Sequence, residues 1–174
     1  MNVACLSYWF PKLAATGVPV PETRIVTTDL PLCMLLDGPE QKDVRLEDWQ
    51  AFVAEVRSAA KEIGGFPCFL RTGHGSGKHD WRTTCYVRDP NALGQHIFNL
   101  VEWSEMVDVF GLPTKVWAVR KLLPLLSSFT AFDGFPVNVE RRYFIEGARS
   151  GAGTPTGRPN PSTGTPKTRT GAES

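Results

Sequence analysis

The feature that most constrains the fold is a short apolar run that ends in an arginine and opens into a glycine-rich loop, at residues 66–81. Residues 66–71 alternate as a β-strand does, and glycines follow, so we expect a strand and its exit loop. Because glycine lacks a Cβ, backbone N–H groups in such a loop can converge on an anion. Arg71 and Lys78 add positive charge on either side. The stretch predicts either a phosphate-holding loop or a plain polar hairpin loop.

Helical periodicity is clearest at residues 46–63, where apolar side chains recur at intervals of three and four and form one stripe. A second helix is predicted to begin at Asp89 and Pro90, which suit an N-cap and the first helical position. His96 lies beside the apolar stripe of this helix, and we interpret it as a packed or surface histidine rather than a ligand.

Alternating or β-branched segments predict the strands. The expected strands are residues 23–28, 31–36, 66–71, 83–87, 115–123 and 137–145. The opening segment, residues 3–10, is expected to be a short strand or a turn, followed by a short helix that begins at Pro11. The predicted class is α+β, with mixed or antiparallel sheets and two main helices.

The composition changes sharply at residue 148. From there to residue 174 glycine, proline, serine and threonine dominate, and no apolar residue larger than alanine occurs. Such a segment cannot bury enough surface to offset the entropy of ordering it. The predicted organisation is therefore a folded region over residues 1–147 and a disordered, basic tail over residues 148–174.

Several broad classes are disfavoured. The net charge is +1, which implies no general attraction to nucleic acid or to a membrane. No run of about eighteen apolar residues occurs, and the first residues do not resemble a signal peptide. The four cysteines are far apart in the sequence, as reduced thiols of a cytoplasmic protein would be. We expect a cytoplasmic protein without a membrane partner, for which nucleic acid is an unlikely ligand.

Two common phosphate motifs are excluded by residue count. A Walker A loop needs glycine where Thr72 stands and a hydroxyl residue where His79 follows the lysine. The loop glycines alternate, which also excludes the G-x-G-x-x-G motif. Two metal hypotheses stay open as alternatives: a zinc site that uses His74, His79 and Cys85, and a metal-dependent hydrolase that uses the two histidines with Asp80.

The order of segments over residues 17–147 resembles the ATP-grasp family. Residues 66–71 are similar to the strand whose last basic residue contacts the α-phosphate side of ATP, with Arg71 where lysine is usual. The loop is similar to the family's phosphate-covering lid, residues 117–124 to the adenine-binding hinge, and residues 138–144 to its E-x-R-x-F strand. The resemblance implies ATP contacts at Arg71, Gly73, Gly75, Ser76, Gly77, Lys78, Lys121, Leu122, Leu123, Glu140 and Arg142.

Glu140 and Arg142 share one face of their predicted strand. They could form a surface ion pair, or Glu140 could hold Arg142 toward a phosphate, and the resemblance favours a γ-phosphate.

The chain departs from the family after Gly147. ATP-grasp enzymes carry acidic and asparagine Mg²⁺ ligands on later strands, and here the tail begins instead, with no E-x-N. The resemblance implies carboxylate activation through an acyl-phosphate and attack by an amine or thiol. We expect a truncated or degenerate member that binds ATP with weak or absent ligase activity, its acceptor substrate unknown. The alternative is a non-catalytic module that binds nucleic acid or an acidic protein, with Trp81, Trp103 and Trp117 as possible stacking surfaces, although core packing is the expected use of each.

Overall fold

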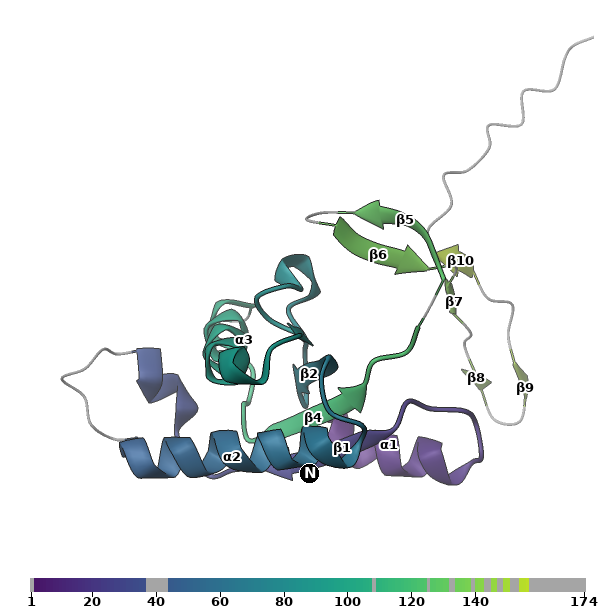
Figure 1. The fold of residues 1–174 in the computed structure, drawn as a ribbon. Coiled ribbons are helices and arrows are strands. Elements are labelled where there is room, and N and C mark those ends of the chain that lie inside the picture. Colours follow the sequence, from purple (N-terminus) through teal and green to yellow (C-terminus); the bar gives the residue numbers. More distant parts are fainter. Residues whose placement is uncertain are drawn as a thin grey trace, which may run out of the picture. The chain divides into compact units, whose positions relative to one another are not determined.

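The computed structural model describes residues 2–36, 44–107, 109–124, 126–131, 134–138, 140–142, 145–146, 149–150 and 154–156. The chain divides into two compact units, which are treated separately here (Figure 1). The first unit comprises residues 1–124 and 131–135, and the second comprises residues 125–130 and 136–174. Helices and antiparallel strands occur together, so the predicted α+β class is confirmed.

A four-stranded antiparallel sheet organises the first unit, with strand order β1-β4-β2-β3. Its strands are β1 (Thr23–Thr27), β2 (Cys68–Thr72), β3 (Tyr86–Val87) and β4 (Val116–Lys121). The two central strands are the predicted strand before the glycine loop and the strand expected at residues 115–123, and both predictions are confirmed.

The first unit contains three α-helices and three short 3₁₀ helices among its described residues. They are α1 (Leu6–Ala15), η1 (Leu32–Leu36), α2 (Leu46–Glu62), η2 (Lys78–Asp80), η3 (Pro90–Ala92) and α3 (Leu93–Val107). The predicted helices correspond to α2 and to η3 with α3. The Asp89 side chain accepts a hydrogen bond from the Asn91 N–H at 2.8 Å, as expected of the N-cap.

One face of the sheet packs against α2 and α3. Trp117 of β4 is fully buried there, and its ring meets that of Phe52 from α2 edge-on at 5.8 Å between centroids. The buried cluster on this face contains Val26, Leu32, Phe52, Val56, Ala59, Ala60, Ile63, Cys68, Leu70, Val87, Leu93, Ile97, Leu100, Val101, Trp117 and Val119. The predicted stripes of both helices supply much of this cluster, but Leu46 at 69% and Met106 at 79% exposure fall outside it.

The N-terminal prediction was wrong, because α1 is one continuous helix in place of a short strand or turn followed by a helix beginning at Pro11. Leu6 and Phe10, four residues apart, pack against Ala118 on the opposite face of the sheet. The Leu6 N–H donates to the Gly73 carbonyl at 2.8 Å, so the glycine loop receives one of the unpaired N–H groups of the first helical turn. Pro11 lies inside the helix.

Two predicted strands differ from the structure. Residues 31–36 contain η1, a 3₁₀ helix that buries Leu32. Strand β3 begins only at Tyr86, because the N–H groups of Thr83 and Thr84 both donate to the Asp80 carbonyl in a turn. Local turn bonds therefore replace the predicted strand at Thr83 and Thr84, whereas the Cys85 carbonyl still accepts from the Leu70 N–H of β2 at 2.8 Å.

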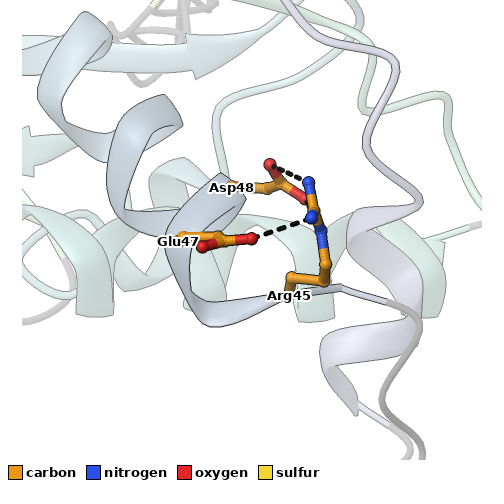
Figure 2. Close-up of polar contacts among 3 residues, drawn as sticks. All are labelled: Arg45, Glu47 and Asp48. Atoms are coloured by element: carbon orange, nitrogen blue, oxygen red, sulfur yellow. Dashed lines mark hydrogen bonds and ion pairs between the residues drawn. The ribbon is translucent and has the colours of Figure 1, made fainter.

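The exposed start of α2 carries a small charge cluster. Arg45 lies directly before the helix and pairs with Glu47 at 2.8 Å and with Asp48 at 2.7 Å, both in the first turn (Figure 2). Carboxylates at a helix N-terminus are favourable, and pairs this exposed contribute roughly 0–1 kcal/mol.

The remaining described strands form three short two-stranded pairs. Strands β5 (Ser127–Ala131) and β6 (Phe135–Asn138) pair, as do β7 (Glu140–Arg142) with β10 (Thr154–Thr156) and β8 (Ile145–Glu146) with β9 (Arg149–Ser150). The strand predicted at residues 137–145 is thus represented by three short strands. The predicted disordered tail, residues 148–174, lies outside the described residues except for β9 and β10. Within the described ranges, no helix has the length and apolar composition that crossing a membrane requires.

Candidate functional site

The sheet face opposite α2 and α3 is built differently. Its central side chains include Phe69 and Arg71 from β2 and Ala118 and Arg120 from β4, because Phe69 is opposite Arg120 and Arg71 is opposite Ala118. Side chains opposite each other on paired strands share a face, so the two arginines are diagonal neighbours. We call the surface formed by Phe69, Arg71 and Arg120 the basic face. Helix α1 covers Ala118 but leaves these three side chains only partly buried.

The two guanidinium groups of the basic face are electrostatically strained. Burial lowers the pKa of Arg120, and the charge of Arg71 lowers it further. Burial also lowers the pKa of Arg71, which the nearby Cys5 thiol opposes in part. Desolvation and a like charge both disfavour the protonated form, but a guanidinium stays charged in proteins. The face therefore holds two positive charges in a partly desolvated setting.

Neither arginine has a carboxylate partner among the residues that the structure describes. The Nε of Arg71 donates to the Thr72 carbonyl at 3.0 Å. The Nε of Arg120 is buried and has no hydrogen-bond partner among the described residues, and its guanidinium lies 5.2 Å from the centre of the Phe10 ring. Arg24, by comparison, lies on the other face and pairs with Glu62 at 2.8 Å. An unpaired, half-buried cation pair is the arrangement that an anionic group would stabilise.

His74 lies in the loop that follows Arg71. Burial lowers its pKa, and the charge of Arg71 lowers it further. The imidazole therefore tends toward its neutral form, so it adds hydrogen-bonding capacity to this region rather than a third charge.

The glycine loop is tied down by the hydroxyl of Thr72, a buried residue at the end of β2. Its Oγ1 accepts from the N–H groups of His74 at 3.3 Å and Gly75 at 3.0 Å. The Gly73 N–H donates to the Val116 carbonyl at 2.7 Å. The glycine loop was expected to present free N–H groups to an anion. The N–H groups of Gly73, His74 and Gly75 instead form hydrogen bonds within the protein. Ser76, Gly77 and Lys78 are the loop positions whose amides have no acceptor among the described residues.

Packing accounts for two of the glycines. A Cβ at Gly75 would collide with the six-membered ring of Trp103, and one at Gly73 would lie 2.6 Å from the Cys5 Sγ. At Gly77 the backbone has φ +56°, in the left-handed region that favours glycine. The glycine spacing therefore has a structural reason that does not require a ligand, although the assignment of these residues to ATP stays a prediction.

The predicted adenine-binding hinge residues line one pocket together with the residues that directly precede β2. Lys121, Leu122 and Leu123 line a pocket of about 270 Å³ together with Phe66 and Pro67. The remaining lining residues are Ile63, Gly64, Gly65 and Pro124. The pocket is slightly below the range of about 300–1,000 Å³ typical of small-molecule sites. A planar ring system is small compared with this volume.

The pocket and the basic face lie at neighbouring positions along β2 and β4 but on different faces of the sheet, because Lys121 shares the face of Val119 and the pocket is also lined by Ile63 at the end of α2. Cys68 is opposite Lys121 at the pocket end, and the next row is Phe69 opposite Arg120. Arg71 lies three residues from Cys68, about 10 Å along the strand. A ligand with its ring in the pocket would have to pass around the strand end at residues 122–123 for its phosphates to reach the basic face.

The remaining predicted site residues are not gathered here. Lys78 is exposed at the start of η2. Glu140 and Arg142 belong to β7 in the second unit, where the structure describes their backbone only. The alternative metal sites at His74, His79, Asp80 and Cys85 find no support, because no three His, Cys, Asp or Glu residues gather for metal binding in the described part of the chain.

Sequence reasoning missed Arg120. The signal that could have found it is parity, since Arg120 alternates with the buried Trp117 and Val119 in β4 and so faces the same side as Arg71. Using that signal requires the register between β2 and β4, which the sequence does not provide.

A scan against protein-family profiles gives no match for this chain, and comparisons with curated proteins and with solved structures give none either.

Proposed function

We propose that this is an ATP-grasp-like protein that binds ATP, with the phosphates on the basic face. The observation that carries the proposal is the pair Arg71 and Arg120, two half-buried guanidinium groups without a carboxylate partner among the described residues. Fork-shaped guanidinium donors match phosphate oxygens, and bound phosphate would offset the desolvation of both cations.

The ring of the nucleotide is proposed to occupy the pocket at residues 121–123. The Lys121 N–H already donates to the Glu22 carbonyl at 2.8 Å. Backbone groups of Leu122 and Leu123 are therefore the hinge groups proposed to read the adenine edge. Both leucine side chains are partly exposed at 37% and 43%, so a planar ring would cover apolar surface there.

Ligase chemistry is proposed to be weak or absent. An ATP-dependent ligase of this kind uses Mg²⁺ to neutralise charge on the β- and γ-phosphates. The described residues do not fit such a site, because no group of three suitable ligands gathers among them. The role left to this chain's own residues is phosphate binding by Arg71 and Arg120. Cytoplasmic localisation belongs to the same proposal, since Cys5, Cys33, Cys68 and Cys85 are all free thiols, as a reducing compartment would keep them.

Calorimetric titration of the full chain with ATP, adenosine and inorganic tripolyphosphate tests this function. We expect ATP to bind most tightly, because only ATP uses both the pocket and the basic face. Arg71→Gln should weaken ATP binding by about tenfold, the loss expected for a charge-assisted hydrogen bond. Arg24→Gln removes the same charge from the other face of the sheet and should leave the ATP affinity unchanged.

Two results would overturn the proposal. Equal ATP affinity in Arg71→Gln and in the unmodified chain would remove Arg71 from the site. Failure to bind ATP, together with single-stranded nucleic acid binding that weakens steeply with salt, would favour the non-catalytic interaction module.

A further inference from the structure

A second pocket lies at the β3 edge of the sheet and takes no part in the proposed ATP site. Its volume is about 470 Å³, within the range typical of small-molecule sites. Among the described residues it is lined by Trp81, Arg82, Tyr86, Arg88, Asp89, Ala92 and His96, and we call it the aromatic pocket. None of these residues lines the pocket at residues 121–123.

Aromatic rings form one wall of the aromatic pocket. The Trp81 and Tyr86 rings stack at a tilt of 37° with centroids 4.7 Å apart, and Phe135 meets Trp81 edge-on at 5.8 Å. The Tyr86 N–H donates to the Trp81 carbonyl at 2.8 Å, which fixes the two backbones against each other. A rigid aromatic wall of this kind favours a planar ring as its ligand.

Positive charge forms the rim. Arg82 lies over the Trp81 ring, with its Cζ 5.8 Å from the ring centre, and Arg88 is exposed two residues after Tyr86. Neither arginine forms an ion pair with the described carboxylates. The Asp89 side chain accepts the Asn91 N–H at 2.8 Å and so serves as the cap of η3. The rim thus has an excess of positive charge, which favours an anionic ligand.

His96 adds an acceptor of fixed orientation. The residue is 7% exposed on α3, and its Nδ1 lies 2.9 Å from the Thr84 carbonyl. A carbonyl only accepts hydrogen bonds, so Nδ1 carries the proton and a neutral ring keeps its lone pair on Nε2. In this tautomer the Nε2 can accept a hydrogen bond from a ligand N–H or O–H. The histidine is packed, as its sequence position suggested, but it also lines a cavity.

We propose that the aromatic pocket binds a small aromatic anion, a planar ring that carries a carboxylate or a phosphate and a hydrogen-bond donor. The ring lies against Trp81 and Tyr86, the anionic group is held by Arg82 and Arg88, and the donor meets His96. The proposal is independent of the ATP site, because no residue is shared between the two.

Titration calorimetry on the full chain tests this with three matched probes: indole-3-acetate, cyclohexylacetate and tryptamine. Indole-3-acetate has both ring and negative charge, cyclohexylacetate lacks the aromatic ring, and tryptamine carries the opposite charge. We expect indole-3-acetate to bind at least about tenfold more tightly than either. AMP is the fourth probe, and it distinguishes a phosphate source of the anion from a carboxylate source.

The variant Arg88→Gln tests whether the probes bind in the aromatic pocket. This exposed substitution should leave the melting temperature unchanged and weaken binding of the preferred probe about tenfold, whereas Arg45→Gln, which removes a charge at the start of α2, should have no effect. Loss of AMP affinity in Arg88→Gln would identify an aromatic phosphate, and loss of indole-3-acetate affinity alone an aromatic carboxylate. The proposal is overturned if cyclohexylacetate binds as well as indole-3-acetate, if no probe binds at about 1 mM, or if Arg88→Gln binds as the unmodified chain does.

Discussion

The two faces of the four-stranded sheet differ in what their side chains contribute. On the face covered by α2 and α3, Trp117, Val119 and Leu70 are fully buried among apolar neighbours. On the basic face, Arg71 and Arg120 are half-buried, and within the described part of the chain the Nε of Arg120 has no hydrogen-bond partner. The first arrangement stabilises the fold and the second opposes it. The proposed anion site would explain why a cation pair is retained against its own desolvation, because a bound anion would offset that cost.

Trp117→Ala should have the largest effect on stability. Trp117 is fully buried and contacts Phe52, so its truncation leaves a cavity in the covered face. We expect a loss of about 3–5 kcal/mol in the free energy of unfolding, measured by urea denaturation. Trp9→Ala, at a partly buried ring on α1, is the matched control and should cost less. An equal loss in the two variants would contradict the assignment of the core to the α2 and α3 side.

Gly75→Ala should come next, because the new methyl group would collide with the Trp103 ring. We expect a loss of about 1–3 kcal/mol in the free energy of unfolding, as for other overpacked sites. Trp103→Leu makes room for the methyl group, so the double variant should lose less than the sum of the single losses. Strictly additive losses would show that packing is not the reason for this glycine.

Arg120→Met should distinguish the two faces because, unlike substitutions in the core, it is expected to stabilise the protein. Removing an unpaired buried donor and its charge, while keeping a long apolar side chain over Phe10, should raise the free energy of unfolding by up to about 1 kcal/mol. The same substitution should weaken ATP binding. A variant that is less stable than the unmodified chain would mean that Arg120 has a structural partner and is no ligand-binding residue.

The smallest expected effect is a pH dependence from His74. Its pKa is lowered in the folded protein by burial and by Arg71, relative to 6.5 for the free group. The unfolded chain then binds more protons between the two values, so stability is full above pH 6.5 and falls as the pH drops toward the folded pKa. His74→Gln should flatten this part of the stability profile, measured by chemical denaturation across the pH range. An unchanged profile would remove His74 from the neighbourhood of Arg71.

Periodicity alone predicted the elements whose stripes face the core, as the match between residues 46–63 and α2 illustrates. Helix α1 was missed because its apolar run precedes a proline, and because its first N–H is received by Gly73, a contact distant in sequence. The loop chemistry was missed for a related reason, since a single hydroxyl on Thr72 takes the amides of His74 and Gly75. Arg71 was predicted from its place at the strand end, whereas Arg120 required the β2–β4 register.

The most direct test of the central claim is a double-mutant cycle on the basic face. ATP affinity would be measured by calorimetry for the unmodified chain, Arg71→Gln, Arg120→Gln and the double variant, with Arg45→Gln as the charge control. We predict that each single substitution weakens binding about tenfold and that the double variant loses less than the product, because both arginines hold the same phosphates. Affinities that are equal in all five chains would contradict the account.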